Sequence, residues 1–290
     1  MPELPEVEVI RRSIEPLVVG RTIARVRTTG DSYFFLTPAR LVARGLRGRR
    51  VLAIERRGKY LSAALDDGAS LLLHLGMTGQ LLSSTACSPR LVRSTRKAGW
   101  VVAPRAFTPD EHTHLELVFA DEGPSLFFRD VRKFGKCALR RAGEREPRLE
   151  RLGVDALEAS GPVLLRATRR RRAAIKSVLL DQTVLAGVGN IYADEALFRA
   201  RVHPERSACH TTATECRNLA TAVKTILREA IRAGGSTIDD YVRPDGTTGG
   251  YSRLCRVYGR DGEPCPRCGQ RIRRVVIQQR SAHFCPECQR

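Results

Sequence analysis

The stretch Cys265–Cys288 reads CPRCGQRIRRVVIQQRSAHFCPEC, and its cysteine spacing decides the fold of the end of the chain. Two Cys-x-x-Cys pairs are separated by sixteen residues. Each pair can bring two thiolates to within about 2.3 Å of one ion, and two pairs complete a tetrahedron. The pattern predicts one structural Zn²⁺ with no coordination position left over for catalysis. The predicted ligands are Cys265, Cys268, Cys285 and Cys288.

The residues between the two pairs predict a β-hairpin with Arg280 near its tip. Residues 253–290 contain nine Arg and only three Asp or Glu. A rigid basic hairpin can lie along a phosphate backbone or in the minor groove of a duplex. A zinc ribbon that binds protein would have the same pattern, so this segment alone leaves both kinds of partner open.

The whole chain is strongly basic, with 50 Lys and Arg against 31 Asp and Glu and a formal net charge of +19 over 290 residues. Such an excess favours a polyanionic partner, nucleic acid before an anionic membrane. No apolar run approaches the ~20 residues of a membrane-spanning helix, and the start lacks the apolar core of a signal peptide. We therefore expect a soluble cytosolic protein of about two domains that does not bind membranes.

The nine cysteines also argue for metal rather than disulfides, because a cytosolic compartment is reducing. Five of them lie outside the two pairs and are expected to be buried or incidental thiols: Cys87, Cys137, Cys209, Cys216 and Cys255.

The first half of the chain predicts one helix followed by strands. Apolar residues recur at helical spacing over 3–18, and Pro5 suits a first helical turn. Short β-rich runs separated by Gly and Asp turns over 21–141 predict a strand-rich sandwich. Residues 83–112 form a long irregular insertion for which the sequence predicts no structure.

The second half predicts helices. Residues 142–162 are charged and punctuated by Gly and Pro, which is typical of a linker. Residues 163–235 have helical periodicity, and 236–253 have the Gly and Pro content of a mobile loop. The last predicted helix carries one apolar stripe: Leu219, Val223, Ile226, Leu227 and Ile231.

The start of the chain offers a reactive group if Met1 is removed, because Pro2 would then carry a free secondary amine. An α-amine has a pKa near 7.7–8.0, against about 10.4 for Lys, so a useful fraction is neutral and nucleophilic. Attack on a sugar C1′ would give a cationic iminium, which favours later elimination. Glu3 and Glu6 lie one helical turn apart and could face the same pocket as acid and base. By itself this pattern equally fits an ordinary solvated helix start.

Six motifs follow one another along nearly the whole chain. They are MPELPEVE at 1–8, RGKYL at 57–61, HLGMTG at 74–79, DVRKFG at 130–135, LLDQTVLAGVGNIYADE at 179–195 and VYGRDGEPC at 257–265. Together and in this order they resemble the formamidopyrimidine-DNA glycosylase family. The long insertion and the lead Tyr251–Arg256 depart from the family pattern, which leaves lesion preference open. Leu4 favours the purine-specific branch over the pyrimidine-specific one.

The resemblance implies catalytic roles for four residues. Pro2 would form the Schiff base, and Glu3 would assist opening of the sugar ring. Lys59, expected on a strand, would bind phosphate and position the sugar, although it could be an ordinary surface lysine. Arg280 would clamp the phosphates around the flipped nucleotide.

The resemblance also implies DNA contacts. His74 and Asn190 would hold the flanking backbone, the alternatives being a packed core histidine and a simple cap of a helix over 191–198. An everted base leaves a hole in the duplex that must be filled. Met77, Arg132 and Phe134 would fill it, although Met77 and Phe134 alone would be assigned to the core.

The base itself would be read by the Gly-rich loop at about 239–251. Glu6 and Tyr251 are the expected residues near it. The pattern Gly187-Val-Gly189 allows close backbone approach at the start of the next helix, whose free N–H groups favour an anion.

These observations predict an α+β fold with four parts. They are an N-terminal helix and β-sandwich domain at 1–141, a linker at 142–162, a helical domain at 163–256 and a zinc finger at 257–290. The resemblance implies that the helical domain is a helix–two-turn–helix DNA-binding domain.

The resemblance implies a monomeric, nucleoid-associated DNA repair enzyme. It would remove 8-oxoguanine and formamidopyrimidines from duplex DNA and cut the strand at abasic sites by β,δ-elimination, with Zn²⁺ as its one cofactor. Two alternatives remain open at this point. They are an endonuclease VIII-like enzyme for oxidised pyrimidines and a non-catalytic zinc-dependent DNA-binding protein.

Overall fold

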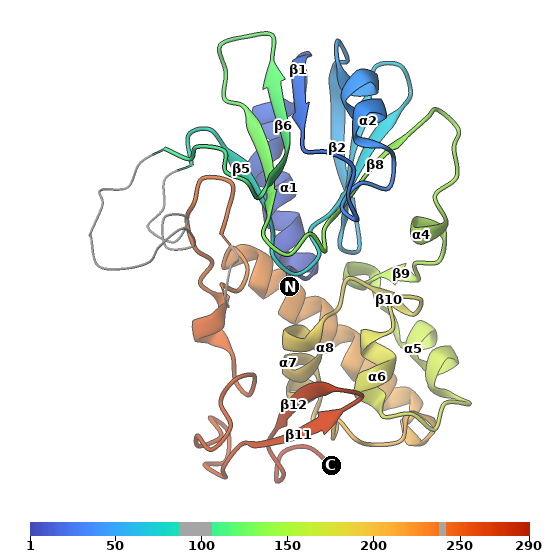
Figure 1. The fold of residues 1–290 in the computed structure, drawn as a ribbon. Coiled ribbons are helices and arrows are strands. Elements are labelled where there is room, and N and C mark those ends of the chain that lie inside the picture. The colour runs from blue at the N-terminus through green and yellow to red at the C-terminus, as the bar shows by residue number, and fades with distance from the viewer. Residues whose placement is uncertain (87–105, 238–241) are drawn as a thin grey trace. The chain divides into compact units, whose positions relative to one another are not determined.

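The computed structural model describes residues 1–86, 106–237 and 242–290. The chain forms two compact units (Figure 1). Unit 1 consists of residues 1–2, 6–146 and 234–250, and unit 2 of residues 3–5, 147–233 and 251–290. Residues 234–250, which were expected to belong with the helical domain, are therefore grouped with the first unit. None of the described helices is long and apolar enough to cross a membrane.

The described residues of unit 1 form two antiparallel four-stranded sheets and two helices. The first sheet has the order β1 (Ile23–Thr28), β6 (Thr113–Phe119), β7 (Leu126–Asp130), β5 (Gly79–Ser83). The second has the order β2 (Val51–Arg57), β3 (Tyr60–Leu65), β4 (Ser70–His74), β8 (Lys136–Arg140). The helices are α1 (Leu4–Val18) and α2 (Ala39–Leu46).

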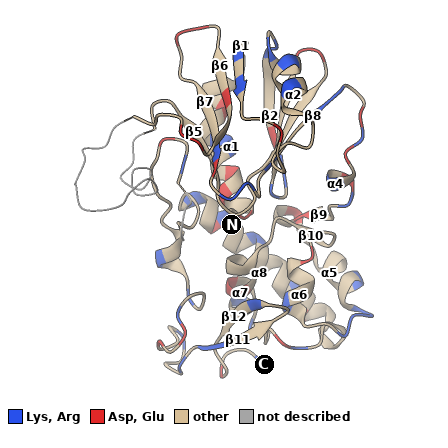
Figure 2. Ribbon diagram, viewed as in Figure 1, with Lys and Arg blue, Asp and Glu red and all other residues tan. Residues whose placement is uncertain are grey.

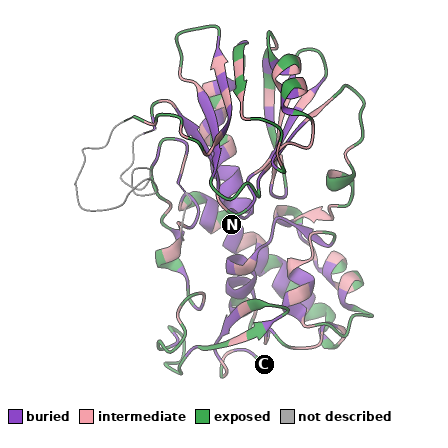
Figure 3. Cartoon of the chain, in the orientation of Figure 1, coloured by how far each residue is buried: buried purple, intermediate pink, exposed green. Residues whose placement is uncertain are grey.

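One apolar core joins both sheets and both helices. Ile10 of α1, Val42 of α2, Leu73 of β4 and Phe128 of β7 belong to the same buried cluster. Side chains alternate across a strand, so each sheet can direct one apolar face inward (Figure 3). The predicted sandwich behind an N-terminal helix is therefore confirmed.

Unit 2 is mostly helical. Its elements before α8 are α4 (Pro147–Glu150), β9 (Val154–Asp155), η1 (Ala156–Glu158), α5 (Gly161–Thr168), α6 (Ile175–Leu180), β10 (Leu185–Ala186), α7 (Asn190–Ala200) and η2 (Ala208–His210). They are followed by α8 (Ala213–Arg232), η3 (Tyr251–Leu254), β11 (Arg273–Ile277) and β12 (Arg280–Phe284). Thr212 and Glu215 form a capping box at the start of α8, and the predicted stripe of this helix is buried.

Two expectations about connecting segments need correction or restriction. Residues 147–158 of the expected linker form α4, β9 and η1, and β9 pairs in parallel with β10. These pieces have two to four residues each, which is too short for periodicity to reveal. Of the insertion at 83–112, residues 87–105 and hence Cys87 lie outside the described residues. The other eight cysteines are free thiols.

Candidate DNA-binding and catalytic site

In unit 2 the carboxylate of Glu3 lies at the start of α7. Its Oε1 accepts the backbone N–H of Ile191 at 3.1 Å, and the residue is only 3% exposed. Gly189 makes room for it, since a Cβ there would lie 2.1 Å from the Glu3 carboxyl carbon. The negative charge at the positive N-terminal end of α7 is therefore supplied by Glu3 of the chain itself.

The close backbone approach expected at Gly187-Val-Gly189 is present, and the segment that approaches is the N-terminal end of the chain, at Glu3 and Leu4. The Leu4 N–H donates to the Gly187 carbonyl at 3.1 Å. The expectation that Asn190 caps the helix is wrong, because Gly189 is the N-cap and Asn190 is the first helical residue. The Asn190 amide instead donates to Ser281 Oγ of the zinc hairpin at 3.2 Å.

In unit 1 the carboxylate of Glu6 accepts the backbone N–H of Ser236 at 2.7 Å and is 2% exposed. Ser236 is the first residue of 236–253, the stretch expected to be a mobile loop, and it lies just before the loop at about 239–251 that was expected to read the base. Glu3 and Glu6 therefore accept from different segments of the chain. Pro2 is buried.

Lys59 lies in the turn between β2 and β3, beside Gly58 with a φ of +58°, and not on a strand. A two-residue turn with positive φ gives no sequence periodicity of its own, whereas the flanking strands do. Lys59 is 7% exposed, so it is not a simple surface lysine. His74 ends β4, where its ring lies 4.6 Å from that of Tyr60 and its Nδ1 accepts the Gly76 N–H at 3.1 Å.

The three residues expected to fill the duplex lie on the surface of unit 1. Met77 is 45% and Phe134 42% exposed, so neither belongs to the core. Arg132 is exposed too, and its guanidinium lies 4.7 Å above the Phe134 ring. Apolar side chains left in water next to an arginine are typical of a binding surface.

One buried carboxylate, Asp130, holds these residues in place. Its oxygens accept from Thr78 Oγ1 at 2.5 Å, the Arg132 N–H at 3.2 Å and the Gly135 N–H at 2.6 Å. A Cβ on Gly76 would lie 2.5 Å from the Gly135 nitrogen, so the two loops touch backbone to backbone. Asp130 thereby ties the loop of Met77 to the loop of Arg132 and Phe134. The sequence analysis quoted Asp130 in a motif but gave it no role.

The zinc module folds as predicted. The four cysteine Sγ atoms lie within 4.8 Å of one another, which fits a tetrahedral ion with thiolate ligands. Burial acts to raise the pKa of Cys265, but the N–H groups of Arg267 and Cys268 outweigh it and bring the pKa to about 7. Burial raises the pKa of Cys285 and of Cys288, so it is the closeness of the four Sγ atoms that suits this site to Zn²⁺.

The hairpin of this module turns through Gln278 and Gln279, which both have positive φ, at 46° and 62°. Arg280 is exposed and follows directly as the first residue of β12. Basic residues are spread over both units, as the blue segments of Figure 2 show.

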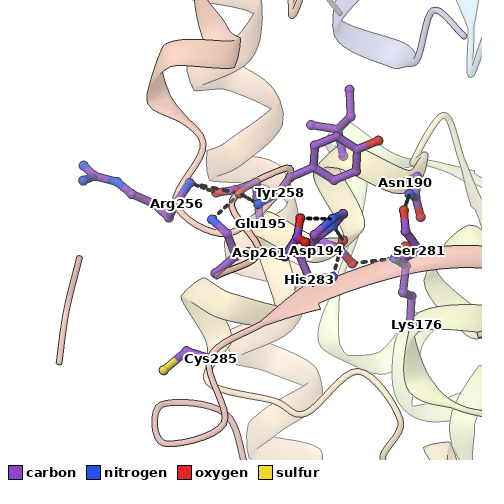
Figure 4. A network of polar contacts seen from close by, with 12 residues as sticks. Lys176, Asn190, Asp194, Glu195, Arg256, Tyr258, Asp261, Ser281, His283 and Cys285 are labelled. Carbon is purple, nitrogen blue, oxygen red and sulfur yellow. Dashed lines mark hydrogen bonds and ion pairs between the residues drawn. The ribbon is translucent and has the colours of Figure 1, made fainter. Parts of the chain in front are cut away.

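A buried polar network supports the hairpin from inside unit 2 (Figure 4). Lys176 and Asp194, both 0% exposed, pair at 2.6 Å, and Lys176 also donates to the Ser281 carbonyl. The other Asp194 oxygen accepts the N–H of His283 at 2.9 Å and faces its Nδ1 at 3.1 Å. Sequence reasoning missed this network, because nothing in one sequence reveals which buried charges meet.

Glu195 and Tyr251 hold the segment that leads into the zinc module. The Glu195 carboxylate accepts the backbone N–H groups of Arg256, Val257 and Tyr258 at 2.9–3.0 Å. Tyr251 is 1% exposed in this structure, and burial raises its pKa above the ordinary value.

Comparisons with known proteins decide the family. The model of the formamidopyrimidine-DNA glycosylase N-terminal domain matches residues 1–137, and that of its H2TH domain matches 152–242. The chain belongs to the formamidopyrimidine-DNA glycosylase family. The model of the zinc finger found in FPG and IleRS matches residues 262–290. The family predicted from the motifs is confirmed, and so is the fold.

Relatives within the glycosylase family match over the full length. The formamidopyrimidine-DNA glycosylase of Thermus thermophilus is 44% identical over 296 residues, covering 100% of this chain and 98% of the relative. The crystal structure of MutM (FPG) from that organism has a TM-score of 0.82 and covers 99% of this chain and 98% of that one. A Lactococcus lactis FPG mutant in complex with Fapy-dG-containing DNA has a TM-score of 0.85 at 34% identity and covers 100% of both chains.

Proposed function

We propose that this protein is a bifunctional DNA glycosylase and abasic-site lyase of base excision repair, acting on oxidised purines in duplex DNA. The observation that carries the proposal is that a buried Pro2 directly precedes Glu3 in the chain, and that the Glu3 carboxylate is fixed at the start of α7. Family membership over the full length supports it, and so do solved relatives in complex with Fapy-dG-containing and abasic-site-containing DNA. Double-stranded DNA is the proposed partner, and we propose a monomer that acts in the cytoplasm in association with the nucleoid.

The chemistry begins once Met1 has been removed. The Pro2 nitrogen forms a bond to C1′ of the damaged nucleotide, and the C1′–base bond breaks with its electron pair leaving on the base. The Pro2 nitrogen gives its proton to the departing base, and Glu3 gives a proton to the ring oxygen as the C1′–ring oxygen bond breaks and the sugar opens. The resulting iminium withdraws electrons, so loss of a C2′ proton expels the 3′ phosphate and a second elimination expels the 5′ phosphate.

The other residues bind and orient the DNA. Lys59 and Arg280 would hold phosphates around the flipped nucleotide, and His74 and Asn190 the flanking backbone. Met77, Arg132 and Phe134 would fill the space that the base leaves. Glu6, through Ser236, would hold the segment that covers the base, with Tyr251 at the end of that segment. Zn²⁺ held by the four cysteines would keep the hairpin of Arg280 rigid.

Borohydride trapping tests the proposal. A duplex with one 8-oxoguanine opposite cytosine, mixed with protein and reductant, should give a covalent adduct that Pro2→Gly loses. Tight binding without any adduct would instead support a non-catalytic DNA-binding protein. Retention of Met1, read by mass spectrometry, would support the same alternative.

The Arg280 assignment has its own measurement. Arg280→Ala should weaken DNA binding and reduce the salt dependence by about one phosphate contact. An unchanged slope would exclude Arg280 from the clamp.

Oxidised pyrimidines are a second candidate substrate class, because one solved relative is a Lactococcus lactis FPG complex with oxidised pyrimidine-containing DNA. Competition between duplexes that carry either lesion separates the two classes. We expect the purine lesion to be excised first.

A further inference from the structure

The loop that carries Arg132 and Phe134 is held at its C-terminal end by the ammonium group of a lysine. We call residues 131–135 the wedge loop; it connects β7 to β8. Lys136, the first residue of β8, donates from Nζ to the carbonyl of Phe134 at 3.3 Å and to that of Gly135 at 3.0 Å. The same ammonium lies 3.4 Å from the centre of the Tyr33 ring. The lysine therefore donates hydrogen bonds to two carbonyls of the wedge loop and makes a cation–π contact with the Tyr33 ring.

Tyr33 is firmly placed although its ring is 74% exposed. The next residue, Phe34, is fully buried and packs edge-on against Phe128 at 4.8 Å. The Cys137 N–H donates to the Phe34 carbonyl at 2.9 Å, and the Cys137 carbonyl accepts the Leu36 N–H at 2.8 Å. Backbone hydrogen bonds thus join the segment of Tyr33 to β8 directly beside Lys136.

The strand register places this arrangement next to the second loop of the proposed duplex-filling group. Lys136 pairs with His74, the last residue of β4. The loop that follows β4 carries Met77, and its Gly76 packs against the backbone of Phe134 and Gly135. Asp130 holds the wedge loop through N–H groups, whereas Lys136 holds it through carbonyls.

We propose that Lys136 and Tyr33 form a brace that positions Phe134 to enter the space left by the flipped base. The inference rests on the proposed function, in which Phe134 fills that space. Without the ammonium the Phe134 and Gly135 carbonyls lose their charged donor, and the peptide planes that aim the Phe134 side chain can rotate. Lys136 and Tyr33 are thus positioning residues, which act on the DNA through Phe134.

The first test compares two reactions of one variant. Lys136→Met should lower kcat/KM for excision of 8-oxoguanine at least tenfold, because it removes two hydrogen bonds from a charged donor and a cation–π contact. Cleavage of a preformed abasic site should stay within about twofold, because no base must be displaced there. Lys136→Arg should restore excision, since it keeps the charge and the donors. Tyr33→Leu should lower excision in the same selective manner.

Arg25→Met is the control, because it removes an exposed positive charge from β1 of the same unit, outside the loops of the proposed duplex-filling group. A phosphate contact at Lys136 would weaken binding of both substrates alike and reduce the salt slope. The control should leave the ratio of the two reactions unchanged. An equal loss of both reactions in Lys136→Met would overturn the brace in favour of a simple phosphate contact.

A double-variant cycle asks whether the brace acts through Phe134. In a Phe134→Ala background, Lys136→Met and Tyr33→Leu should each have no further effect on excision. A full additional loss in either double variant would refute positioning, and for Tyr33 it would indicate its own contact with DNA. Melting temperatures of all variants identify any loss that is merely structural.

The two proposals fail differently. If the wild-type protein forms no adduct with lesion-containing duplexes, the proposed function is wrong. If the wild type excises the lesion and Lys136→Met does so equally well, the brace alone is wrong.

Discussion

The buried pair of Lys176 and Asp194 gives the sharpest prediction about stability. Both side chains are 0% exposed, and their charged atoms are 2.6 Å apart. Replacing Lys176 by Met removes the cation and leaves Asp194 charged and buried, a loss that typically costs about 3–5 kcal/mol. His283 still offers Asp194 two nitrogens, which places the expected cost at the lower end, about 3 kcal/mol.

The partner substitution sharpens this prediction. Burial lowers the pKa of Lys176 despite the attraction of Asp194. The free energy that the ammonium loses on leaving water is therefore larger than the free energy that it gains from pairing with Asp194. Such pairs can be replaced by apolar residues at little cost. The double variant Lys176→Met, Asp194→Leu should therefore recover at least half of the lost stability.

Urea unfolding followed by release of zinc to a coloured chelator measures this, because the zinc hairpin lies in the same unit. With slopes of about 1–3 kcal/mol per molar urea, Lys176→Met should lower the midpoint by about 1–3 M. A shift below about 0.3 M would refute the reasoning. So would a double variant less stable than the single one, since the remaining charge would then not be the cause.

Three further predictions concern other parts of the chain. Burial acts to raise the pKa of Glu8, but the guanidinium groups of Arg11, Arg12 and Arg56 outweigh it and lower the pKa below 4.5. Glu8→Gln should cost about 1–3 kcal/mol at pH 7, and its deficit should shrink as the pH falls through the lowered pKa; a deficit that is constant with pH in denaturant titrations would contradict this. Gly189→Ala should displace Glu3 and reduce borohydride trapping more than tenfold, whereas Gly30→Ala, with nothing within 4 Å of its added Cβ, should trap normally. Chelation of zinc should abolish duplex binding in a filter or anisotropy assay while strand circular dichroism persists, and unchanged affinity would separate the metal from DNA binding.

Periodicity and spacing predicted the elements whose signal is local. The stripe of α8 and the hairpin between the cysteine pairs follow from residues close in sequence. The short elements between residues 147 and 158 were not predicted, because β9 is defined by a parallel partner, β10, whose paired residues lie thirty-one positions further along the chain. Lys59 was predicted to lie on a strand because Gly58 is the only residue in the sequence that marks the turn.

The candidate site was predicted through motifs and not through geometry. Met77 and Phe134 have the chemistry of core residues, and only the resemblance separated them from the core; their exposure now agrees with it. The supports of the site remained hidden. Asp130, Lys176 and Lys136 act through partners that are distant in the chain or through backbone groups, which a residue pattern does not encode.

The two glutamines at the hairpin turn bear on how the protein responds when zinc is scarce. Positive φ disfavours residues with a Cβ, so the turn of Gln278 and Gln279 is held against their own preference by the structure around it. When the four thiols lose their ion, the tip can relax before the folded body does, and Arg280 follows it immediately. Under the proposed role of Arg280 as a phosphate contact, a cell short of zinc would contain protein with an intact sandwich and weakened binding of damaged DNA, so that repair capacity would decline before the protein itself disappeared.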